Sequence, residues 1–308
     1  MIVLSGEVDK KYNHNIYLAL GSFDGLHQGH MSLIEKVKEY AAVNGGKSMV
    51  YTFSNHPLTT IAPDKAPKLL MDNDTKINLL ADKGIDFLVL EDFDEKFMQL
   101  SPEEFISKIC NEFNVKGIVV GFNYRFGYKN LGDVELLKVL SAKYKFDLTI
   151  MPPFKDKDHV ISSTFIRKLI ASGEIIEANE YLLEPFMING KIISGKGIGR
   201  TLGYPTANLD YNKNFVIPQK GVYYTNVKYK EKIYKGITNI GFNPTVNGNN
   251  LTIETYILDF DKDIYGEEIS VYFIEKTRNE SKFSNLNELI SQLRLDEKEA
   301  SLKKIYIK

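Results

Sequence analysis

Residues 16–30 read IYLALGSFDGLHQGH, in which a short apolar run leads into three glycines spaced four residues apart. An apolar face with helical spacing follows directly, at Leu33, Ile34, Val37 and Ala41. A strand that passes through a glycine-bearing loop into a helix is typical of an open α/β sheet, whose ligands bind at the carboxyl ends of its strands. The stretch therefore predicts a parallel sheet with an anion-binding loop at its edge.

The alternation of apolar runs and helical segments continues to about residue 155. The runs are rich in branched and aromatic residues, as strands covered on both faces are, and lie at 49–53, 87–90, 117–120 and 148–151. One helix start is clear, because Ser101 precedes a proline at the first helical position and Glu104 stands where it completes a capping box. We expect a doubly wound, Rossmann-like α/β domain.

The pattern changes after a further helical segment at roughly 164–183. Apolar runs then follow one another with only turn residues between them, at 187–193, 222–227, 233–240, 251–258 and 269–274. Their spacing leaves no room for crossover helices, so these strands should pair antiparallel and close into a small β-barrel. The tail, 284–307, returns to helical spacing. We therefore expect two domains, residues 1–183 and 184–308.

The composition is that of an ordinary globular protein, with 43% hydrophobic and 26% charged residues among 308. The 39 basic and 40 acidic side chains leave a net charge of -1, so no overall field favours nucleic acid or an anionic membrane. The one cysteine, Cys110, excludes an internal disulfide framework and fits a reducing compartment. No apolar stretch has the length of a secretion signal or a membrane span. We expect a cytoplasmic protein, monomeric or weakly homo-oligomeric, whose partners are small molecules rather than nucleic acid or membrane.

The loop after the first strand combines glycine with histidine. Gly21, Gly25 and Gly29 let the backbone approach phosphate groups closely. His27 and His30 add donors that balance the charge developing during phosphoryl transfer. This combination predicts a site for the phosphates of a nucleotide.

The same histidines leave two other interpretations open. One is a tight strand-to-helix turn that carries two surface histidines. The other is a zinc site completed by Asp24 or His56, although no cysteine assists and the glycines suit phosphate better. His56 itself precedes Pro57, so it is either a loop histidine ahead of a proline turn or a contact to nucleotide.

Two further segments carry polar groups at places where anions bind. Residues 161–167 read ISSTFIR, so hydroxyls, free amides and an arginine converge at a helix start, where a leaving pyrophosphate fits; a merely well-capped helix is the alternative. Residues 121–127 read GFNYRFG and follow a predicted strand. Together with the first loop, these segments resemble the motifs of the nucleotidyltransferase superfamily in the form found in FMN adenylyltransferases. The resemblance implies nucleotide binding by Gly21, Phe23, Asp24, Gly29, Ser162, Ser163, Thr164 and Arg167, catalysis by His27 and His30, and flavin binding by Asn123, Arg125 and Phe126.

A second glycine-rich segment, GKGIGRTLGYPTAN at 195–208, lies among the predicted antiparallel strands. It has neither the spelling nor the context of a P-loop, but its glycines can wrap a phosphate chain with backbone amides; a hairpin loop with incidental glycines is the plainer alternative. Thr206 and Asn208 lie two residues apart on an extended segment, and their neutral oxygens suit Mg²⁺ held beside ATP phosphates. We expect phosphate binding by Gly195, Lys196, Gly197, Gly199 and Arg200.

This segment resembles the GRxLGxPTAN motif of riboflavin kinases, and the likeness continues through 221–223, 239–245, 263–266 and 278–283. It implies that Glu254 is the general base and that Arg278 clamps phosphate or flavin. Strand alternation places Thr252, Glu254 and Tyr256 on one face but does not fix which face points inward. A solvated acidic residue and an ordinary surface arginine are the respective alternatives.

Nearly the whole chain, from residue 16 to about 296, thus resembles the bifunctional riboflavin kinase/FMN adenylyltransferase family. The resemblance implies that ATP phosphorylates riboflavin to FMN in the second half and adenylylates FMN to FAD in the first, with Mg²⁺ as cofactor. Two alternatives remain. One is a riboflavin kinase with reduced or lost adenylyltransferase activity, and the other is a flavin-binding regulator without turnover.

Overall fold

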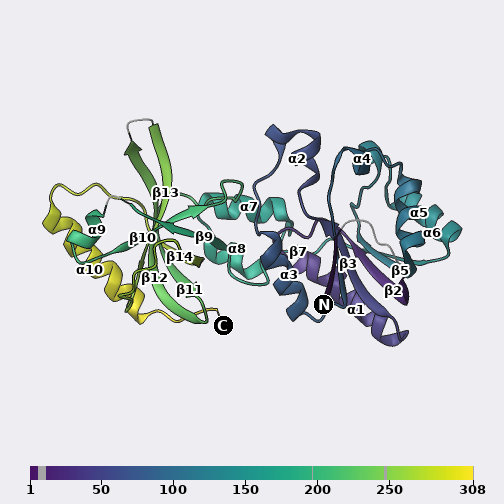
Figure 1. The fold of residues 1–308 in the computed structure, drawn as a ribbon, viewed down its shortest axis with the longest axis horizontal. Coiled ribbons are helices and arrows are strands. Elements are labelled where there is room, and N and C mark those ends of the chain that lie inside the picture. Colours follow the sequence, from purple (N-terminus) through teal and green to yellow (C-terminus); the bar gives the residue numbers. More distant parts are fainter. Residues whose placement is uncertain (6–11, 196, 246–247, 308) are drawn as a thin grey trace. The chain divides into compact units, whose positions relative to one another are not determined.

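The computed structural model describes residues 1–5, 12–195, 197–245 and 248–307. The chain forms two compact units that divide between Ser163 and Thr164 (Figure 1). By contacts, this division lies earlier than the expected boundary at 183/184, because helix α8 (Ile175–Tyr181) packs in the second unit. Asn179 of α8 donates a hydrogen bond to the Phe273 carbonyl (2.9 Å) and accepts one from the Phe186 amide (2.8 Å).

The first unit is built on a six-stranded sheet ordered β1-β4-β3-β2-β5-β6, in which neighbouring strands are parallel. Without β1 the order β4-β3-β2-β5-β6 is that of the first five strands of a Rossmann fold, in which the chain winds outward from its first strand in one direction and then in the other. The predicted doubly wound fold is therefore confirmed, and β1 is an added edge strand that the sequence analysis did not identify. The strands are β1 (Ile2–Ser5), β2 (Tyr12–Leu20), β3 (Lys47–Phe53), β4 (Phe87–Glu91), β5 (Phe113–Gly121) and β6 (Asp147–Met151).

Helices connect these strands, and the predicted capping box is present at the start of one of them, α5. The Ser101 hydroxyl accepts from the Glu104 amide (3.2 Å), while the Ser101 amide donates to the Glu104 carboxylate (2.8 Å). The helices are α1 (Gln28–Val43), α2 (Pro57–Ile61), α3 (Asn73–Asp82), α4 (Glu95–Met98), α5 (Pro102–Glu112) and α6 (Val134–Tyr144). Short 3₁₀ turns lie at Pro63–Lys65 and Tyr128–Asn130, and a small hairpin pairs β7 (Lys155–Asp156) with β8 (His159–Val160).

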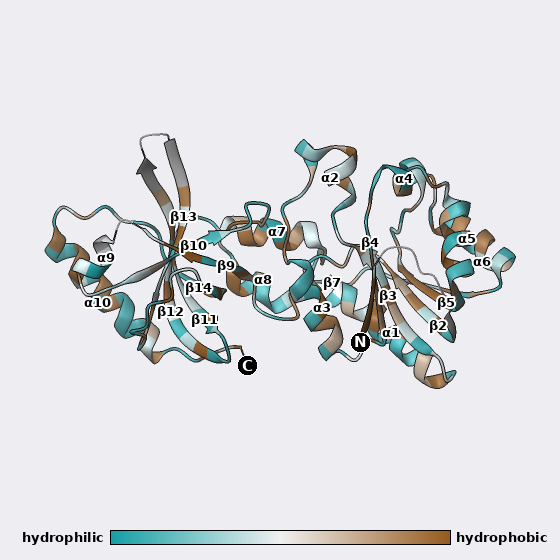
Figure 2. Cartoon of the chain, in the orientation of Figure 1, coloured by the Kyte–Doolittle hydropathy of each residue, from teal (hydrophilic) through white to brown (hydrophobic). Residues whose placement is uncertain are grey.

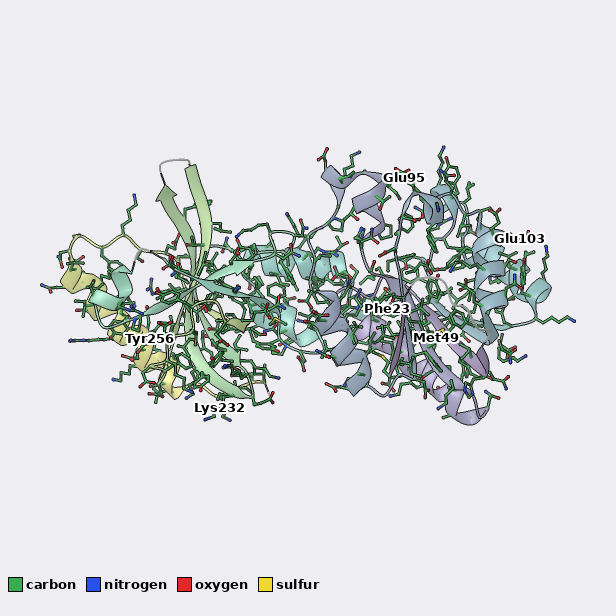
Figure 3. All side chains as sticks on the ribbon, in the orientation of Figure 1. Phe23, Met49, Glu95, Glu103, Lys232 and Tyr256 are labelled. Atoms are coloured by element: carbon green, nitrogen blue, oxygen red, sulfur yellow. The ribbon has the colours of Figure 1, made fainter. Side chains whose placement is uncertain are left out.

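The core of the first unit lies between the sheet and its helices. Figure 2 shows apolar residues along the central strands of this sheet. Ile16 and Leu18 of β2 are fully buried, as continuous apolar strands covered on both faces should be. Phe23 and Met49, labelled in Figure 3, are also fully buried in this unit. Because the buried Phe23 belongs to the loop after β2, the packed core also holds this loop in place.

The second unit contains a closed barrel of six strands ordered β10-β13-β12-β11-β14-β9, with antiparallel neighbours. The barrel confirms the predicted fold, and its additional strand is β10 (Thr206–Tyr211), which the sequence analysis described only as an extended segment. The other strands are β9 (Met187–Ile193), β11 (Gly221–Tyr229), β12 (Lys232–Thr245), β13 (Gly248–Ile257) and β14 (Glu268–Arg278). The unit also contains the helices α7 (Ser163–Ser172), α9 (Ile198–Thr201) and α10 (Leu286–Leu302).

The barrel interior fixes the orientation of β13. Three buried threonines, Thr225, Thr238 and Thr255, form a chain of hydroxyl hydrogen bonds of 2.9 Å each. Ile253 and Ile257 lie on the same face of β13 as Thr255 and are buried as well. Since side chains alternate along a strand, the intervening residues of β13 point out of the barrel.

The chain after α10 is tied to the barrel at β11. Tyr224 donates its phenol hydrogen to the Lys304 carbonyl (2.7 Å), and the buried Asn226 accepts from the Tyr306 amide (2.7 Å). These bonds hold the carboxyl end of α10 against the strands. In the part of the chain that the structure describes, no helix combines the length and apolar character needed to cross a membrane.

Candidate functional site

The sheet topology brings the first two motifs to one edge of the first unit. β2 and β5 are neighbours, and the chain winds outward from them in opposite directions. Such a switch point leaves a crevice outside the carboxyl ends of the two strands, where α/β proteins bind their ligands. The glycine and histidine loop follows β2 and the 121–127 loop follows β5. The predicted nucleotide and flavin loops therefore flank this crevice.

The loop after β2 is held by its backbone. The Ser22 carbonyl accepts a hydrogen bond from the Thr52 hydroxyl (2.9 Å), and the Gly21 amide lies 3.4 Å from the Tyr51 carbonyl. Phe23 adopts a left-handed conformation (φ 47°) that is uncommon for a residue with a side chain, and its ring is fully buried. Its centroid lies 5.1 Å from that of His30. Buried packing thus offsets the local strain and fixes the loop beside the histidines.

Asp24 is an anchor of this loop. Its carboxylate, 5% exposed, accepts hydrogen bonds from the backbone amides of Leu70 (3.1 Å) and Met71 (3.3 Å). Its carbonyl accepts from the Ser163 hydroxyl (2.8 Å). The observed contacts of Asp24 therefore connect the histidine loop to two distant segments of the first unit. Nucleotide binding by Asp24, Gly21 and Phe23 stays a prediction.

The two histidines form a stacked pair at the start of α1. Their ring centroids are 3.7 Å apart with planes at 23°, and His27 occupies the N-cap position. Both Nδ1 atoms are buried, and His27 is 5% exposed. A Cβ at Gly29 would lie 3.1 Å from the His27 ring, so a larger residue there would make a tight contact that pushes the ring aside by a few tenths of an ångström. Burial argues against the interpretation of His27 as a surface histidine, and among the described residues no three His, Cys, Asp or Glu side chains gather as a metal site.

The 121–127 loop presents two exposed polar side chains beside one core residue. Asn123 and Arg125 are exposed, and Arg125 pairs with Asp133 across 3.3 Å. Phe126 is 5% exposed and stacks on Tyr124, with centroids 5.5 Å apart. The accessible polar groups are therefore Asn123 and Arg125, whereas Phe126 is buried and packs against the core.

The predicted helix-start motif lies at the division between the units. Ser162 and Ser163 close the first unit, and Ser163 begins α7. Thr164 and Arg167 lie on α7 within the second unit. Thr164 is exposed and Arg167 half-buried. The assignment of these residues to a leaving pyrophosphate stays a prediction.

Two further polar residues lie near the carboxyl end of β3. His56 caps α2, because its Nδ1 accepts from the Leu58 amide (3.1 Å), which is the role of a histidine ahead of a proline turn. Lys76 on α3 is 6% exposed, and its ammonium lies 3.5 Å from the Phe53 carbonyl. Burial lowers the pKa of Lys76, against the raising effects of Asp24 and Asp72. The sequence analysis did not identify this buried cation, because no local pattern distinguishes it from a surface lysine of an amphipathic helix.

In the second unit, the predicted metal and base residues share one outward face of neighbouring strands. Asn208 of β10 and Asn239 of β12 are the Cα partners of Glu254, and Thr206 is that of Tyr256. Residues directly opposite in antiparallel strands point to the same side of the sheet. Glu254 is half-buried and accepts a hydrogen bond from the Thr252 hydroxyl (3.3 Å). The structure thus settles which face carries Glu254: the outer one, beside Thr206 and Asn208.

The glycine-rich segment folds over this face. A Cβ at Gly195 would lie 2.3 Å from the Asn208 amide nitrogen, so the backbone passes directly above that side chain. The short helix α9 follows, carrying Gly199 and Arg200, and its end is closed by the bond from the Tyr204 amide to the Gly199 carbonyl (2.8 Å). Lys196 lies outside the described residues. Gly195 therefore lies against Asn208, and a Cβ at Gly199 would lie 3.5 Å from Thr206 Oγ1, so the described segment runs beside both residues predicted to hold magnesium.

A cavity of about 480 Å³ opens beside this loop. Arg200 lies on its wall with its guanidinium 6.0 Å from the Tyr265 ring centroid. Part of the lining is apolar, as a site for a flat ring requires. The cavity is lined by Ile192, Arg200, Gly203, Pro205, Thr206, Ala207, Thr255, Tyr256, Ile257 and residues 260–265.

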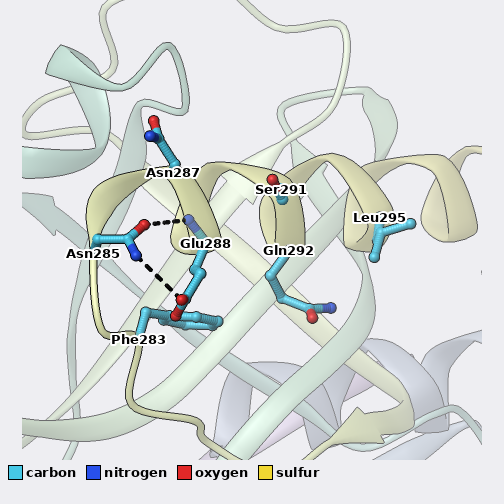
Figure 4. Close-up of a pocket in the computed structure, with 7 residues that line it drawn as sticks. All are labelled: Phe283, Asn285, Asn287, Glu288, Ser291, Gln292 and Leu295. Carbon is cyan, nitrogen blue, oxygen red and sulfur yellow. Dashed lines mark hydrogen bonds between the residues drawn. The ribbon is translucent and has the colours of Figure 1, made fainter.

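Arg278 makes an ion pair with α10. Its guanidinium contacts the Asp296 carboxylate at 2.7 and 3.0 Å, and Asp296 also accepts from Gln292 (2.8 Å). Gln292 lines a hollow along α10, shown in Figure 4, in which Asn285 caps the helix through the Glu288 amide (3.0 Å). The flavin-clamp role of Arg278 stays a prediction, and the observed contact of its guanidinium is with Asp296 of α10.

Comparison with known proteins matches each half of the chain to a family of flavin-metabolising enzymes. The chain matches the family model of FAD synthetase over residues 9–165 and that of riboflavin kinase over 182–303. A bifunctional riboflavin kinase/FMN adenylyltransferase of Listeria monocytogenes is 37% identical, with coverage of 92% of this chain and 91% of its own. This chain belongs to that family. The Escherichia coli K12 member is 38% identical over 91% of this chain and 90% of its own. A solved structure from Streptococcus pneumoniae, described as a macrolide-efflux protein, shares 32% identity and a TM-score of 0.89 over 99% of this chain and 100% of that one.

Proposed function

We propose that this chain makes FAD from riboflavin in two steps, phosphorylating riboflavin in the second unit and adenylylating FMN in the first. The observation that carries the proposal is the face shared by Glu254, Asn208 and Thr206 under the glycine-rich loop. Phosphoryl transfer to a hydroxyl needs a carboxylate as base and neutral oxygens for a metal ion. These groups lie here beside a cavity that Arg200 lines.

In the first step, Glu254 accepts the proton of the terminal ribityl hydroxyl as its oxygen bonds to the γ-phosphorus of ATP. The bond from that phosphorus to the bridging oxygen breaks, which releases ADP and leaves FMN. Thr206 and Asn208 suit Mg²⁺, which takes few protein ligands and completes its shell with water and phosphate oxygens. Bound there, Mg²⁺ would offset the negative charge of the phosphate chain. The backbone amides of the 197–204 loop orient that chain.

In the second step, a phosphate oxygen of FMN bonds to the α-phosphorus of ATP, and pyrophosphate leaves. No covalent enzyme intermediate is required. His27 and His30 stand at the N-terminus of α1, where ring donors and the helix dipole stabilise the negative charge that grows on the transferring group. Asn123 and Arg125 are the accessible polar groups on the opposite side of the crevice and hold the flavin substrate.

The test is chromatographic identification of the products from riboflavin, ATP and Mg²⁺ with purified protein. We expect FMN and FAD. Glu254→Gln should form no FMN from riboflavin yet convert supplied FMN to FAD, because the general base lies in the other unit. Glu268→Gln, an exposed carboxylate of the same barrel, is the matched control and should retain both steps. FMN as sole product would indicate a kinase without adenylyl transfer, and no product from either substrate would favour a flavin-binding regulator.

A further inference from the structure

Two tyrosines, Tyr204 in the loop after α9 and Tyr256 on β13, contact a single carboxylate on α10. The Tyr256 phenol donates to Glu297 Oε1 (2.9 Å) and the Tyr204 phenol donates to Oε2 (3.2 Å). The two rings pack edge to face, with centroids 5.1 Å apart and planes at 67°. All three side chains are half-buried. Glu297 therefore joins three separate elements through both of its oxygens.

Each tyrosine is directly connected to a group of the proposed site. Tyr204 closes α9 through its amide, so it fixes the turn that carries Gly199 and Arg200. Tyr256 lies two residues from Glu254 on the same outward face. It is the Cα partner of Thr206 and lines the cavity. A displacement of either phenol would thus move the glycine loop relative to the base and the metal-binding oxygens.

At neutral pH, Tyr204 and Tyr256 keep the protons that they donate to Glu297. Burial raises the pKa of Tyr256 to about 12, and the Glu297 carboxylate adds to this rise. Burial and Glu297 also raise the pKa of Tyr204, while Arg294 opposes that effect. Both phenols therefore remain protonated donors at neutral pH, and a hydrogen bond to a carboxylate is stronger than one between neutral groups.

We propose that Glu297 is a positioning residue of the kinase site, which holds the 197–204 loop beside Thr206, on the face that also carries Asn208 and Glu254, by anchoring Tyr204 and Tyr256 to α10. The proposal rests on the function proposed above for the second unit. Because the glycine-rich loop is proposed to bind the phosphates of ATP, the role of Glu297 should affect the binding of ATP rather than that of riboflavin. Loss of the anchor should raise the KM for ATP more than it lowers kcat, because the reacting groups themselves are unchanged.

The experiment measures steady-state FMN formation by Glu297→Ala, Glu297→Gln, the pair Tyr204→Phe/Tyr256→Phe, and the triple variant. We expect Glu297→Ala to raise the KM for ATP on the order of tenfold, as loss of two charge-assisted hydrogen bonds allows. Glu297→Gln keeps one acceptor oxygen and should show a smaller rise. The phenylalanine pair should match Glu297→Ala, and the triple variant should be no worse than either, because all of them remove the same interaction.

Two controls separate positioning from general damage. Glu299→Ala removes the same charge from an exposed position of α10 and should leave the KM unchanged. Conversion of FMN to FAD by each variant should equal that of the unchanged protein, because it depends on the first unit. An unchanged KM for ATP in Glu297→Ala, or additive effects in the triple variant, would overturn the role of Glu297. Absence of FMN formation by the unchanged protein would instead refute the proposed function itself and this role with it.

Discussion

At the scale of single residues, Lys76 shows how burial changes a charge. Its ammonium is almost fully buried, and the net effect of its surroundings is to lower its pKa. Between that lowered pKa and the ordinary value near 10.5, the unfolded chain binds more protons at this residue than the folded chain does. The contribution of Lys76 to the free energy of unfolding therefore rises with pH across this window and is least favourable below it.

We predict that Lys76→Met raises the unfolding temperature of the first unit at neutral pH. The methionine fills a similar volume and carries no charge to desolvate. The gain should shrink as pH rises toward 10.5, because the lysine of the folded protein loses its proton over this range and its burial then no longer costs the desolvation of a charge. Thermal unfolding at several pH values measures this difference, with Lys83→Met at the C-cap of the same helix as control. A lower unfolding temperature for Lys76→Met would show that attraction to Asp24 and Asp72 outweighs the cost of burial.

Sequence motifs predicted the candidate site residues, but they did not predict contacts between residues distant in the sequence. The two stacked histidines lie in the glycine-bearing loop after β2, where a functional loop was predicted, whereas Glu254 lies on β13 and was predicted from the resemblance alone. Glu297 gave no signal, because a glutamate on an amphipathic helix is ordinary until the fold places two phenols beside it. The ion pair of Arg278 with Asp296 was equally invisible, since 18 residues separate its members.

At the scale of elements, periodicity and capping predicted the long helices and buried strands. Short elements escaped prediction: β1 has only four residues, and β10 is recognised by its partners β9 and β13 rather than by an apolar run. The predicted helix at 164–183 is divided in the structure into α7 and α8 by Gly173, whose φ is 87°. Local sequence thus predicts an element when its own side chains form a recognisable buried face. It does not predict an element that is identified only by its pairing with neighbouring strands.

The capping box of α5 permits a test at this scale. Ser101→Ala removes a hydrogen bond that satisfies the first turn and should cost about 1 kcal/mol, or roughly fivefold in the opening of the helix. Cys110 lies in the same helix, and burial raises the pKa of its thiol to about 11, so alkylation near neutral pH is slow until the helix opens. We expect iodoacetamide to label Cys110 several times faster in Ser101→Ala.

The matched control is Ser107→Ala, a substitution inside α5 that improves helix propensity and should not accelerate labelling. The chain contains one cysteine, so the adduct measured by mass spectrometry reports this helix alone. Equal labelling rates in the three proteins would mean that the capping box does not limit the opening of α5.

At the scale of the whole molecule, two folds of different class carry two sites. The change from crossover helices to closely spaced strands was readable because each class imposes its own spacing on apolar residues. The position of the division was harder to infer, since α7 and α8 resemble the helices of the first unit in sequence pattern but belong by contact to the second. Each unit has its own core, so damage to one site should leave the other in place.

This independence predicts complementation between variants. His27→Ala/His30→Ala should form FMN from riboflavin but no FAD, and Glu254→Gln should form FAD only from supplied FMN. Mixed in solution with riboflavin, ATP and Mg²⁺, the two proteins should restore FAD formation, because FMN released by one is a substrate for the other. Chromatography of the mixture measures this directly. If each protein performs its remaining step while the mixture yields no FAD, FMN is not released between the sites, and if either variant loses both steps while folded, the sites are not separate.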